Sequence, residues 1–162
     1  MANLLNNPGF DTDTSSWVNL GTTTMARTTA DFHTGPACLD VATGTDFNGI
    51  AQSGFAGLST GATFRTAMWL KAKDAPSVGV QVDMFLISNN TGEQWGKGFL
   101  LPADWTYCEM IATLTGISTN CRFDIRNSGA ASNFFMDDAL VEWYFEEAEQ
   151  SYRQGLSPLV WR

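Results

Sequence analysis

Apolar and polar residues alternate along most of the chain, a pattern typical of β-strands that bury one face. In the clearest run, residues 63–73, Phe64 and Leu70 share one face while Arg65 and Trp69 share the other. Similar runs span residues 25–29, 37–41, 47–55, 77–88, 93–101, 105–114, 122–127 and 134–143. The pattern therefore predicts a chain built mainly of short strands.

Turn-forming residues separate these runs, and no helical period appears between them. The turns read Asn-Pro-Gly at 7–9, His-Thr-Gly-Pro at 33–36 and Asn-Asn-Thr-Gly at 89–92. Parallel neighbours would need long crossover connections, usually helices, so the strands are expected to be antiparallel. We predict an all-β fold, an antiparallel β-sandwich that forms one domain over residues 1–144.

The end of the chain has a different pattern. Glutamates and an apolar i, i+4 pair predict a short helix over residues 142–154. Beyond it, Leu159, Val160 and Trp161 are apolar and should be covered, either by their own domain or by another chain. We interpret residues 145–162 as a tail that serves as an assembly arm. This predicts a homo-oligomer or contacts with other protein subunits.

Composition narrows the range of partners. The net charge is −8 and the sequence pI is about 4.4, which argues against nucleic acid and anionic membranes as partners. Only 16% of the residues are charged, whereas one third are Gly, Thr, Ser or Asn. No apolar run is long enough to span a membrane, and the first residues show no secretory signal. We expect either a complete product that is not exported or a domain cut from a larger protein.

Few residues suggest catalysis. The single histidine, His33, lies in a turn, and no phosphate-binding loop or zinc-protease motif is present. Asp137 and Asp138 are adjacent, so on a regular strand they would point to opposite faces rather than converge on one bond. The cysteines at 38, 108 and 121 are widely spaced, which suits buried free thiols better than a zinc site. We therefore predict a protein that is not an enzyme.

Several motifs occur in a recognisable order. Residues 3–11 read NLLNNPGFD and are followed by Trp17; residues 31–39 read DFHTGPACL, 61–72 GATFRTAMWLKA, 104–106 DWT and 134–141 FFMDDALV. This ordered set resembles the carbohydrate-binding modules of the family 4/9/16/22 group over about residues 3 to 141. The resemblance implies a galactose-binding-like jelly-roll β-sandwich that holds a glycan on a concave sheet or on a loop edge.

The resemblance also implies a structural calcium ion near the joined ends of the domain. Residue by residue, its ligands would be Asp11, the backbone of Thr34 and Gly35, and Asp137. Calcium prefers roughly six to eight hard oxygen ligands, which carboxylates and carbonyls supply. Asp11 stands where these modules usually have Glu, and its shorter side chain would make the site weaker or remove it.

Sugars are bound by aromatic rings that stack on their C–H faces and by polar groups that bind their hydroxyls. The strand faces that offer this mixture are Arg65/Trp69, Gln81/Asp83/Phe85 and Arg122/Asp124/Arg126. If these strands share a sheet, they form one polar surface with two aromatic rings, which is our candidate glycan site. Trp95 is an alternative exposed platform, and Trp17 and Trp105 are expected in the core. In the competing interpretation the Arg and Asp side chains pair across strands as a solvated face, and a loop or the tail covers Trp69.

Two functions fit these expectations. The first is a non-catalytic structural or adhesive jelly-roll protein of a bacteriophage particle, such as a capsid decoration or tail component with retained sugar affinity. It would be made without an export signal and would lie at the virion surface. The alternative is the glycan-binding module of a secreted polysaccharide hydrolase, which would be extracellular. Either one would bind a polysaccharide or a cell-surface glycan.

Overall fold

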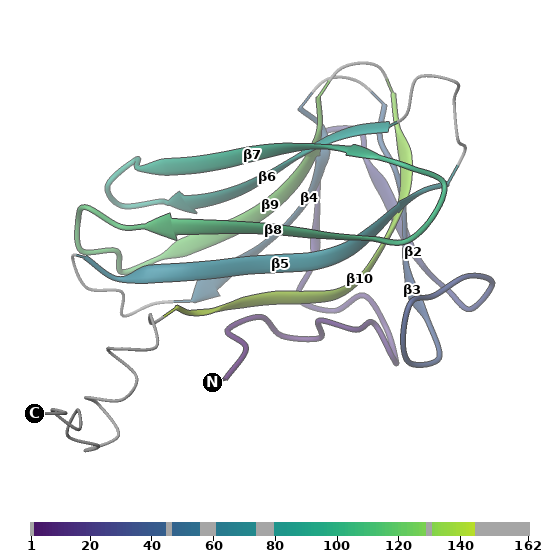
Figure 1. The fold of residues 1–162 in the computed structure, drawn as a ribbon, viewed down its shortest axis with the longest axis horizontal. Helices are drawn as coiled ribbons and strands as arrows, with labels where there is room; N and C mark the ends of the chain where they lie inside the picture. Colours follow the sequence, from purple (N-terminus) through teal and green to yellow (C-terminus); the bar gives the residue numbers. More distant parts are fainter. Residues whose placement is uncertain (1, 45–46, 56–60, 74–79, 129–130, 145–162) are drawn as a thin grey trace, which may run out of the picture.

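Two antiparallel sheets, A and B, make up the part of the chain described by this computed structural model, which comprises residues 2–44, 47–55, 61–73, 80–128 and 131–144 (Figure 1). The strands are β1 (Val18–Leu20), β2 (Thr24–Thr28), β3 (Cys38–Ala42), β4 (Gly49–Phe55), β5 (Thr63–Ala72), β6 (Val80–Ser88), β7 (Gln94–Leu101), β8 (Thr106–Thr113), β9 (Cys121–Asn127) and β10 (Asn133–Trp143). Sheet A has the order β1-β4-β9-β6-β7, and sheet B has the order β2-β3-β10-β5-β8.

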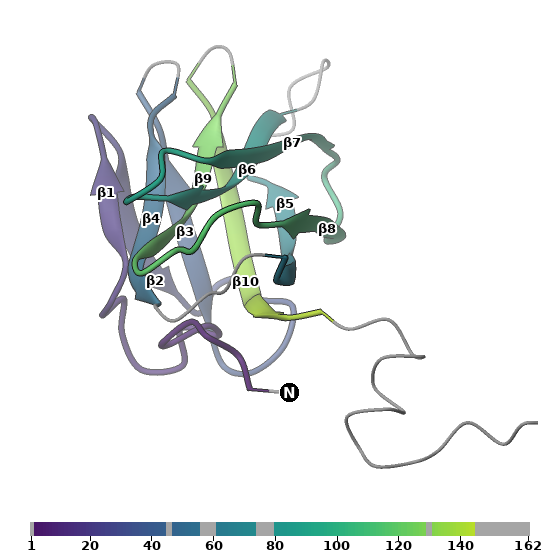
Figure 2. The same cartoon turned by 90° about the vertical axis from the view of Figure 1, so that its left-hand side faces the viewer.

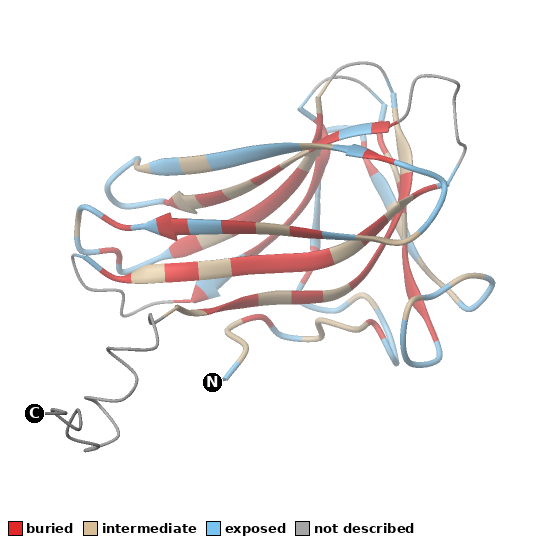
Figure 3. Cartoon of the chain, in the orientation of Figure 1, coloured by how far each residue is buried: buried red, intermediate tan, exposed pale blue. Residues whose placement is uncertain are grey.

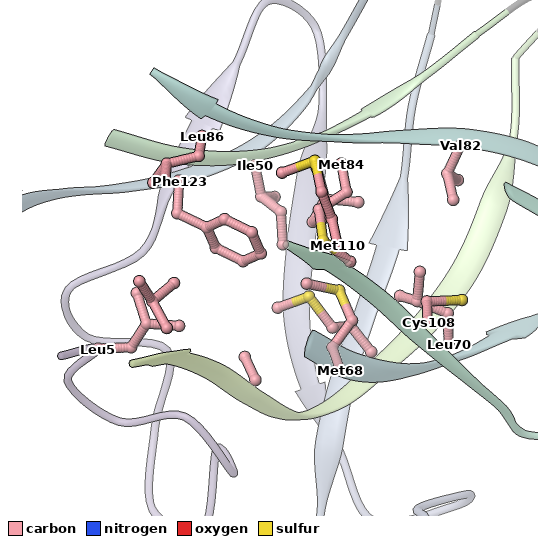
Figure 4. Packing of buried hydrophobic residues seen from close by; sticks show 14 of the residues in the cluster. Leu5, Ile50, Met68, Leu70, Val82, Met84, Leu86, Cys108, Met110 and Phe123 are labelled. Atoms are coloured by element: carbon pink, nitrogen blue, oxygen red, sulfur yellow. The ribbon is translucent and has the colours of Figure 1, made fainter. Parts of the chain in front are cut away.

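The inner faces of the two sheets form one apolar core. Buried and more exposed residues alternate along the central strands, as Figure 3 shows for β5 and β6. Phe123 from sheet A is fully buried, and Met68, Met84 and Met110 lie between the sheets (Figure 4). Unbranched methionine side chains fill irregular gaps, and full burial of a side chain of this size contributes about 1.5–3 kcal/mol.

The sequence pattern predicted this architecture well. The all-β jelly-roll sandwich is confirmed, and the strands from β2 to β10 start and end within a few residues of the predicted runs. The short strand β1 was not predicted. Residues 142–143 belong to β10, not to the start of a helix, and the Tyr144 amide donates to the Thr63 carbonyl of sheet B. The rest of the predicted helix, residues 145–154, and the arm with Leu159, Val160 and Trp161 lie outside the described residues.

Strand β10 contains an irregularity that matters for the site. Its pairing with β5 shifts register between Asp137 and Leu140, and Asp138 has a φ of 50°. Such a bulge interrupts the alternation of side chains along a strand. The carboxylates of Asp137 and Asp138 consequently both contact residues 33–34. The expectation that they point to opposite faces was therefore wrong.

The first residues of the chain run beside the end of β10 (Figure 2). The Leu4 amide donates to the Val141 carbonyl at 2.7 Å, and the Val141 amide donates to Asn3 Oδ1 at 3.0 Å. Further along, the Ala139 amide donates to the Pro8 carbonyl. These bonds hold the two ends of the sandwich side by side. No helix within the described residues has the length and apolar character needed to cross a membrane.

Candidate functional site

The outer face of sheet A gathers most of the predicted glycan-site residues. Strands β6 and β9 are neighbours, and their register places Phe85 opposite Asp124 and Asp83 opposite Arg126. Because alternate residues of both strands fill the core, the intervening residues point outward together. The resulting surface, called here the β6–β9 face, consists of Gln81, Asp83, Phe85, Arg122, Asp124 and Arg126.

A carboxylate held between two arginines lies at the centre of this face. Arg122 Nε donates to Asp124 Oδ1 at 2.8 Å, and Arg126 donates to Asp124 Oδ2 from Nε at 3.1 Å and from Nη2 at 2.5 Å. Asp124 is fully buried, whereas the side chains of Arg122 and Arg126 remain 30% and 21% exposed. The arginines thus cover the carboxylate and present their own guanidinium groups to solvent.

Phe85 supplies the aromatic surface beside this cluster. The Arg126 guanidinium lies 5.3 Å from the centre of the Phe85 ring, within the range of a cation–π interaction. Neighbouring strand β7 carries Gly96 and Gly98 opposite Phe85 and Asp83. A Cβ added at Gly96 would lie 2.6 Å from the Phe85 ring, and one at Gly98 would lie 2.9 Å from Asp83 Oδ1. The two glycines therefore make the space into which the side chains of Phe85 and Asp83 extend.

Trp69 does not belong to this surface, so the prediction that these three strand faces share a sheet was wrong. Strand β5 is in sheet B, between β10 and β8, whereas β6 and β9 are in sheet A. The His33 ring stacks on Trp69 with centroids 3.8 Å apart, and Tyr107 lies 5.4 Å from it. A loop thus covers Trp69, as the competing interpretation proposed. Arg65 also lies on sheet B, where it pairs with Glu142.

Three further tryptophans, Trp17, Trp95 and Trp105, contact other parts of the fold. Trp95 on β7 is half-buried and packs against the core, so it is not the exposed platform proposed from the sequence. Trp17 is buried in the core as predicted. Trp105 is only half-buried and lies at sheet B, where its Nε1 donates to Asp31 Oδ1 at 3.1 Å.

Asp31 fixes the loop that covers Trp69. Its carboxylate accepts from Lys71 Nζ at 2.5 Å in addition to the indole of Trp105. Desolvation raises the pKa of Asp31, but the bonds from Lys71 and Trp105 outweigh it, so the pKa of this carboxyl is lowered overall. The ionised form of Asp31 therefore stabilises the folded state.

The residues implied as calcium ligands meet at the turn around residues 33–35. Asp137 is fully buried, and its Oδ2 accepts the amides of His33 and Thr34 at 3.0 Å each. A Cβ added at Gly35 would lie 2.7 Å from Asp11 Oδ1, so the Asp11 side chain lies against this turn. Burial is the largest cause that raises the pKa of Asp137, and the bond from the Thr34 amide opposes it. No cluster of three His, Cys, Asp or Glu side chains suited to a metal ion occurs in the described part of the chain.

The three cysteines are free and buried, as the sequence indicated. Desolvation raises the pKa of Cys38 to about 12 and that of Cys108 to about 11. Thiolates are the reactive form of cysteine, so these two side chains act as small apolar residues in the folded protein.

Comparisons with known proteins agree with this architecture. A sequence family described as "Carbohydrate binding domain" matches residues 2–130. No curated protein matches the chain. The CBM22-1 xylan-binding domain of Paenibacillus barcinonensis Xyn10C superimposes with a TM-score of 0.73 at 12% identity, over 88% of this chain and 94% of that one.

Two further solved structures share the fold. The module TmCBM61, solved in complex with β-1,4-galactotriose, gives a TM-score of 0.64 at 16% identity, over 89% of this chain and all of the other. The enzymatically active domain of tailspike protein 4 from bacteriophage CBA120 gives 0.66 at 10% identity, over 88% of this chain and 21% of that one. At these identities the likeness concerns the fold.

Proposed function

Because the chain belongs to the carbohydrate-binding domain family, we propose that it binds a glycan on the β6–β9 face and leaves the glycan chemically unchanged. The observation that carries this proposal is the combination of a half-buried aromatic ring with hydrogen-bonding groups held in place around it. The Phe85 ring offers a surface on which the C–H face of a sugar can stack. Gln81, Asp83 and the two arginines supply donors and acceptors for its hydroxyls.

The geometry favours binding over catalysis. Hydrolysis of a glycosidic bond usually needs two available carboxyl groups, one on each side of the bond. Of the two carboxylates on this face, Asp124 is fully buried and both its oxygens accept bonds from arginines. It is therefore unavailable as an acid, base or nucleophile. An assay for reducing ends with the glycans that bind should show no product.

The binding test compares Phe85→Ala with Tyr107→Ala. Tyr107 is an aromatic residue that is 45% exposed on the outer face of sheet B, so it is a matched control for loss of a ring. On a glycan array followed by calorimetry, Phe85→Ala should lose at least about tenfold in affinity, the equivalent of roughly 1.4 kcal/mol. Tyr107→Ala should bind like the wild type. Equal binding by both variants would refute the assignment of the site.

For the wider setting, we propose a component of a virus particle, and we keep a hydrolase module as the second candidate. The fold likeness to a tailspike domain supports the first, and the likeness to a xylan-binding domain of Xyn10C supports the second. Size-exclusion chromatography of the full chain and of residues 1–144 separates them. An oligomer that becomes a monomer on truncation supports assembly through the arm at the virion surface. A monomer in both cases that is pulled down by insoluble polysaccharide supports the extracellular module.

We also propose that calcium binds at the turn around residues 33–35. Asp137 Oδ1 accepts only the Asp138 amide among the described residues and so retains a lone pair, and the Asp11 carboxylate lies against the same turn. Backbone carbonyls of Thr34 and Gly35 would add further oxygen ligands. Calcium would then raise the melting temperature of the wild type above its value in chelator. Asp11→Asn should reduce that difference, and no difference in the wild type would refute calcium binding.

A further inference from the structure

The two positive and two negative charges of the β6–β9 face are unevenly distributed over it. In sheet B, Arg65 contacts the carboxylates of Glu142 and Glu109, and Lys71 pairs with Asp31. Lys73, at the end of β5, pairs with Asp40, and Arg27 on β2 donates to the backbone carbonyls of Phe10 and Asp11. On the β6–β9 face, by contrast, Arg122 and Arg126 share Asp124. The cluster of these three residues therefore carries one positive charge in excess, although the chain as a whole has a net charge of −8.

Asp83 brings the total charge of the face to zero but does not pair with the arginines of β9. It stands opposite Arg126 in the register of β6 and β9, yet no ion pair joins the two within the described residues. The position of its Oδ1 against Gly98 shows that the carboxylate leans towards β7, away from β9. The face thus has a positive side on β9 and a negative group that leans from β6 towards β7, and Phe85 lies on β6 opposite Asp124.

Arg122 is the residue with donors to spare. It uses Nε for its bond to Asp124, while Arg126 uses both Nε and Nη2 for its own. The two terminal nitrogens of Arg122 make no bond in the described part of the structure, and they form the planar pair that matches a carboxylate. Arg122 is also a diagonal cross-strand neighbour of Phe85, a backbone separation of roughly 7–8 Å that a long side chain spans.

We propose that the β6–β9 face prefers an acidic glycan, in which a uronate carboxylate pairs with Arg122 while a sugar ring stacks on Phe85. This inference rests on the proposed function and specifies the class of ligand. Neutral sugars could use the same hydrogen-bond donors, but they would leave the excess positive charge uncompensated. A carboxylate that pairs with the free terminal nitrogens of Arg122 compensates the local positive charge of the Arg122–Asp124–Arg126 cluster, which Asp83 leaves unpaired.

Calorimetry with paired oligosaccharides tests the preference. The full chain is titrated with oligogalacturonate and with its methyl ester, which keeps the sugar rings and removes the charge. A second pair consists of oligomannuronate and its carboxyl-reduced form. Sulfated galacto-oligosaccharides form a third arm. In at least one pair the acid should bind about tenfold more tightly than its neutral partner, as expected for one charge-assisted pair at a half-exposed site. It should also bind more tightly than the sulfated sugar.

Variants assign the preference to one residue. Arg122→Gln should reduce the acid-to-neutral ratio to about one, because binding of the acid weakens far more than binding of the neutral sugar, to which Gln can still donate a hydrogen bond. Arg122→Lys, which keeps the charge without the planar fork, should retain an intermediate ratio. Lys73→Gln, which removes a charge from sheet B, should keep the wild-type ratio. Thermal melts check that each variant is folded.

The outcomes separate this inference from the proposed function. If neutral sugars bind as tightly as their acidic partners in every pair, the preference is wrong and glycan binding stands. If the sulfated sugar binds best, the carboxylate assignment is wrong. If no glycan binds at all, both proposals are overturned. A ratio that survives in Arg122→Gln would show that another group binds the acid.

Discussion

Removal of the carboxylate of Asp124 is expected to destabilise the protein markedly, although the residue lies on the outer face of a sheet. The change to Ala removes three charge-assisted hydrogen bonds, one from Arg122 and two from Arg126. It also leaves two like charges as near neighbours on β9 with no carboxylate between them. Both effects favour the unfolded chain, in which each guanidinium is fully hydrated.

The magnitude follows from the exposure of the partners. A hydrogen bond to a charged group contributes roughly 1.5–3 kcal/mol, and removal of one member of a fully buried pair costs about 3–5 kcal/mol. Here the arginine side chains are 21–30% exposed, so water molecules can replace part of the hydrogen bonding that the carboxylate supplied. We therefore expect Asp124→Ala to lower the free energy of unfolding by about 2–3 kcal/mol. Asp124→Asn, which keeps one acceptor, should cost about half of that.

Urea denaturation followed by tryptophan fluorescence measures this loss. With a slope of roughly 1.5–2 kcal/mol per molar urea, the midpoint of Asp124→Ala should fall by about 1–2 M. Asp83→Ala is the matched control, because Asp83 is a carboxylate on the same face without an ion pair in the described structure; its midpoint should move by less than about 0.3 M. A double-mutant cycle with Arg126→Gln should give a coupling of about 1 kcal/mol or more. Equal midpoints for Asp124→Ala and Asp83→Ala would refute the reasoning.

Three further predictions concern other parts of the fold. Because the pKa of Asp31 is lowered in the folded state, its ionised carboxylate stabilises the protein at neutral pH, and this stabilisation is lost as the pH falls below the usual carboxyl range. In denaturant titrations, Asp31→Asn should therefore lose less stability than the wild type between pH 6 and pH 3. Equal losses in the two proteins would contradict this. Gly96→Val places methyl groups where the Phe85 ring lies, so it should abolish glycan binding and lower the free energy of unfolding by about 1–3 kcal/mol. Wild-type affinity of this variant in calorimetry would show that the sugar does not stack on the Phe85 ring. Cys38 and Cys108 should not react with a thiol reagent at pH 8 in the folded protein but should react fully in urea, and rapid labelling of the native state would show that they are accessible.

Alternation along the chain was sufficient to predict every described strand except β1. In β6 and β9, for example, the polar residues that point outward were identified correctly, because the period of two directly reports which side of a strand meets the core. The same signal carries no information about which strands are neighbours. Trp69 was therefore grouped with Phe85, although β5 and β6 belong to different sheets. Pairing depends on contacts between residues far apart in the sequence.

Local irregularities of the strands could not be predicted from the sequence either. The bulge after Asp137 reverses the alternation that places neighbouring carboxylates on opposite faces, and no residue in that segment marks it in advance. The role of Gly96 and Gly98 became visible only when β7 was paired with β6, because a glycine matters here for the neighbour that it accommodates. The shared use of Asp124 by two arginines is a contact within one strand. The spacing placed the three residues on one face, but the pairing considered there was between strands.

The hydrogen bonds between residues 3–4 and Val141 have a consequence for the use of this domain as a building block. The two ends of the domain lie close together, so a host protein can receive the domain in a surface loop whose own two ends are close together. The sandwich can thus be spliced into the middle of another chain as readily as it can be appended to one end. In either arrangement the two ends of the sandwich meet the host beside β10 of sheet B.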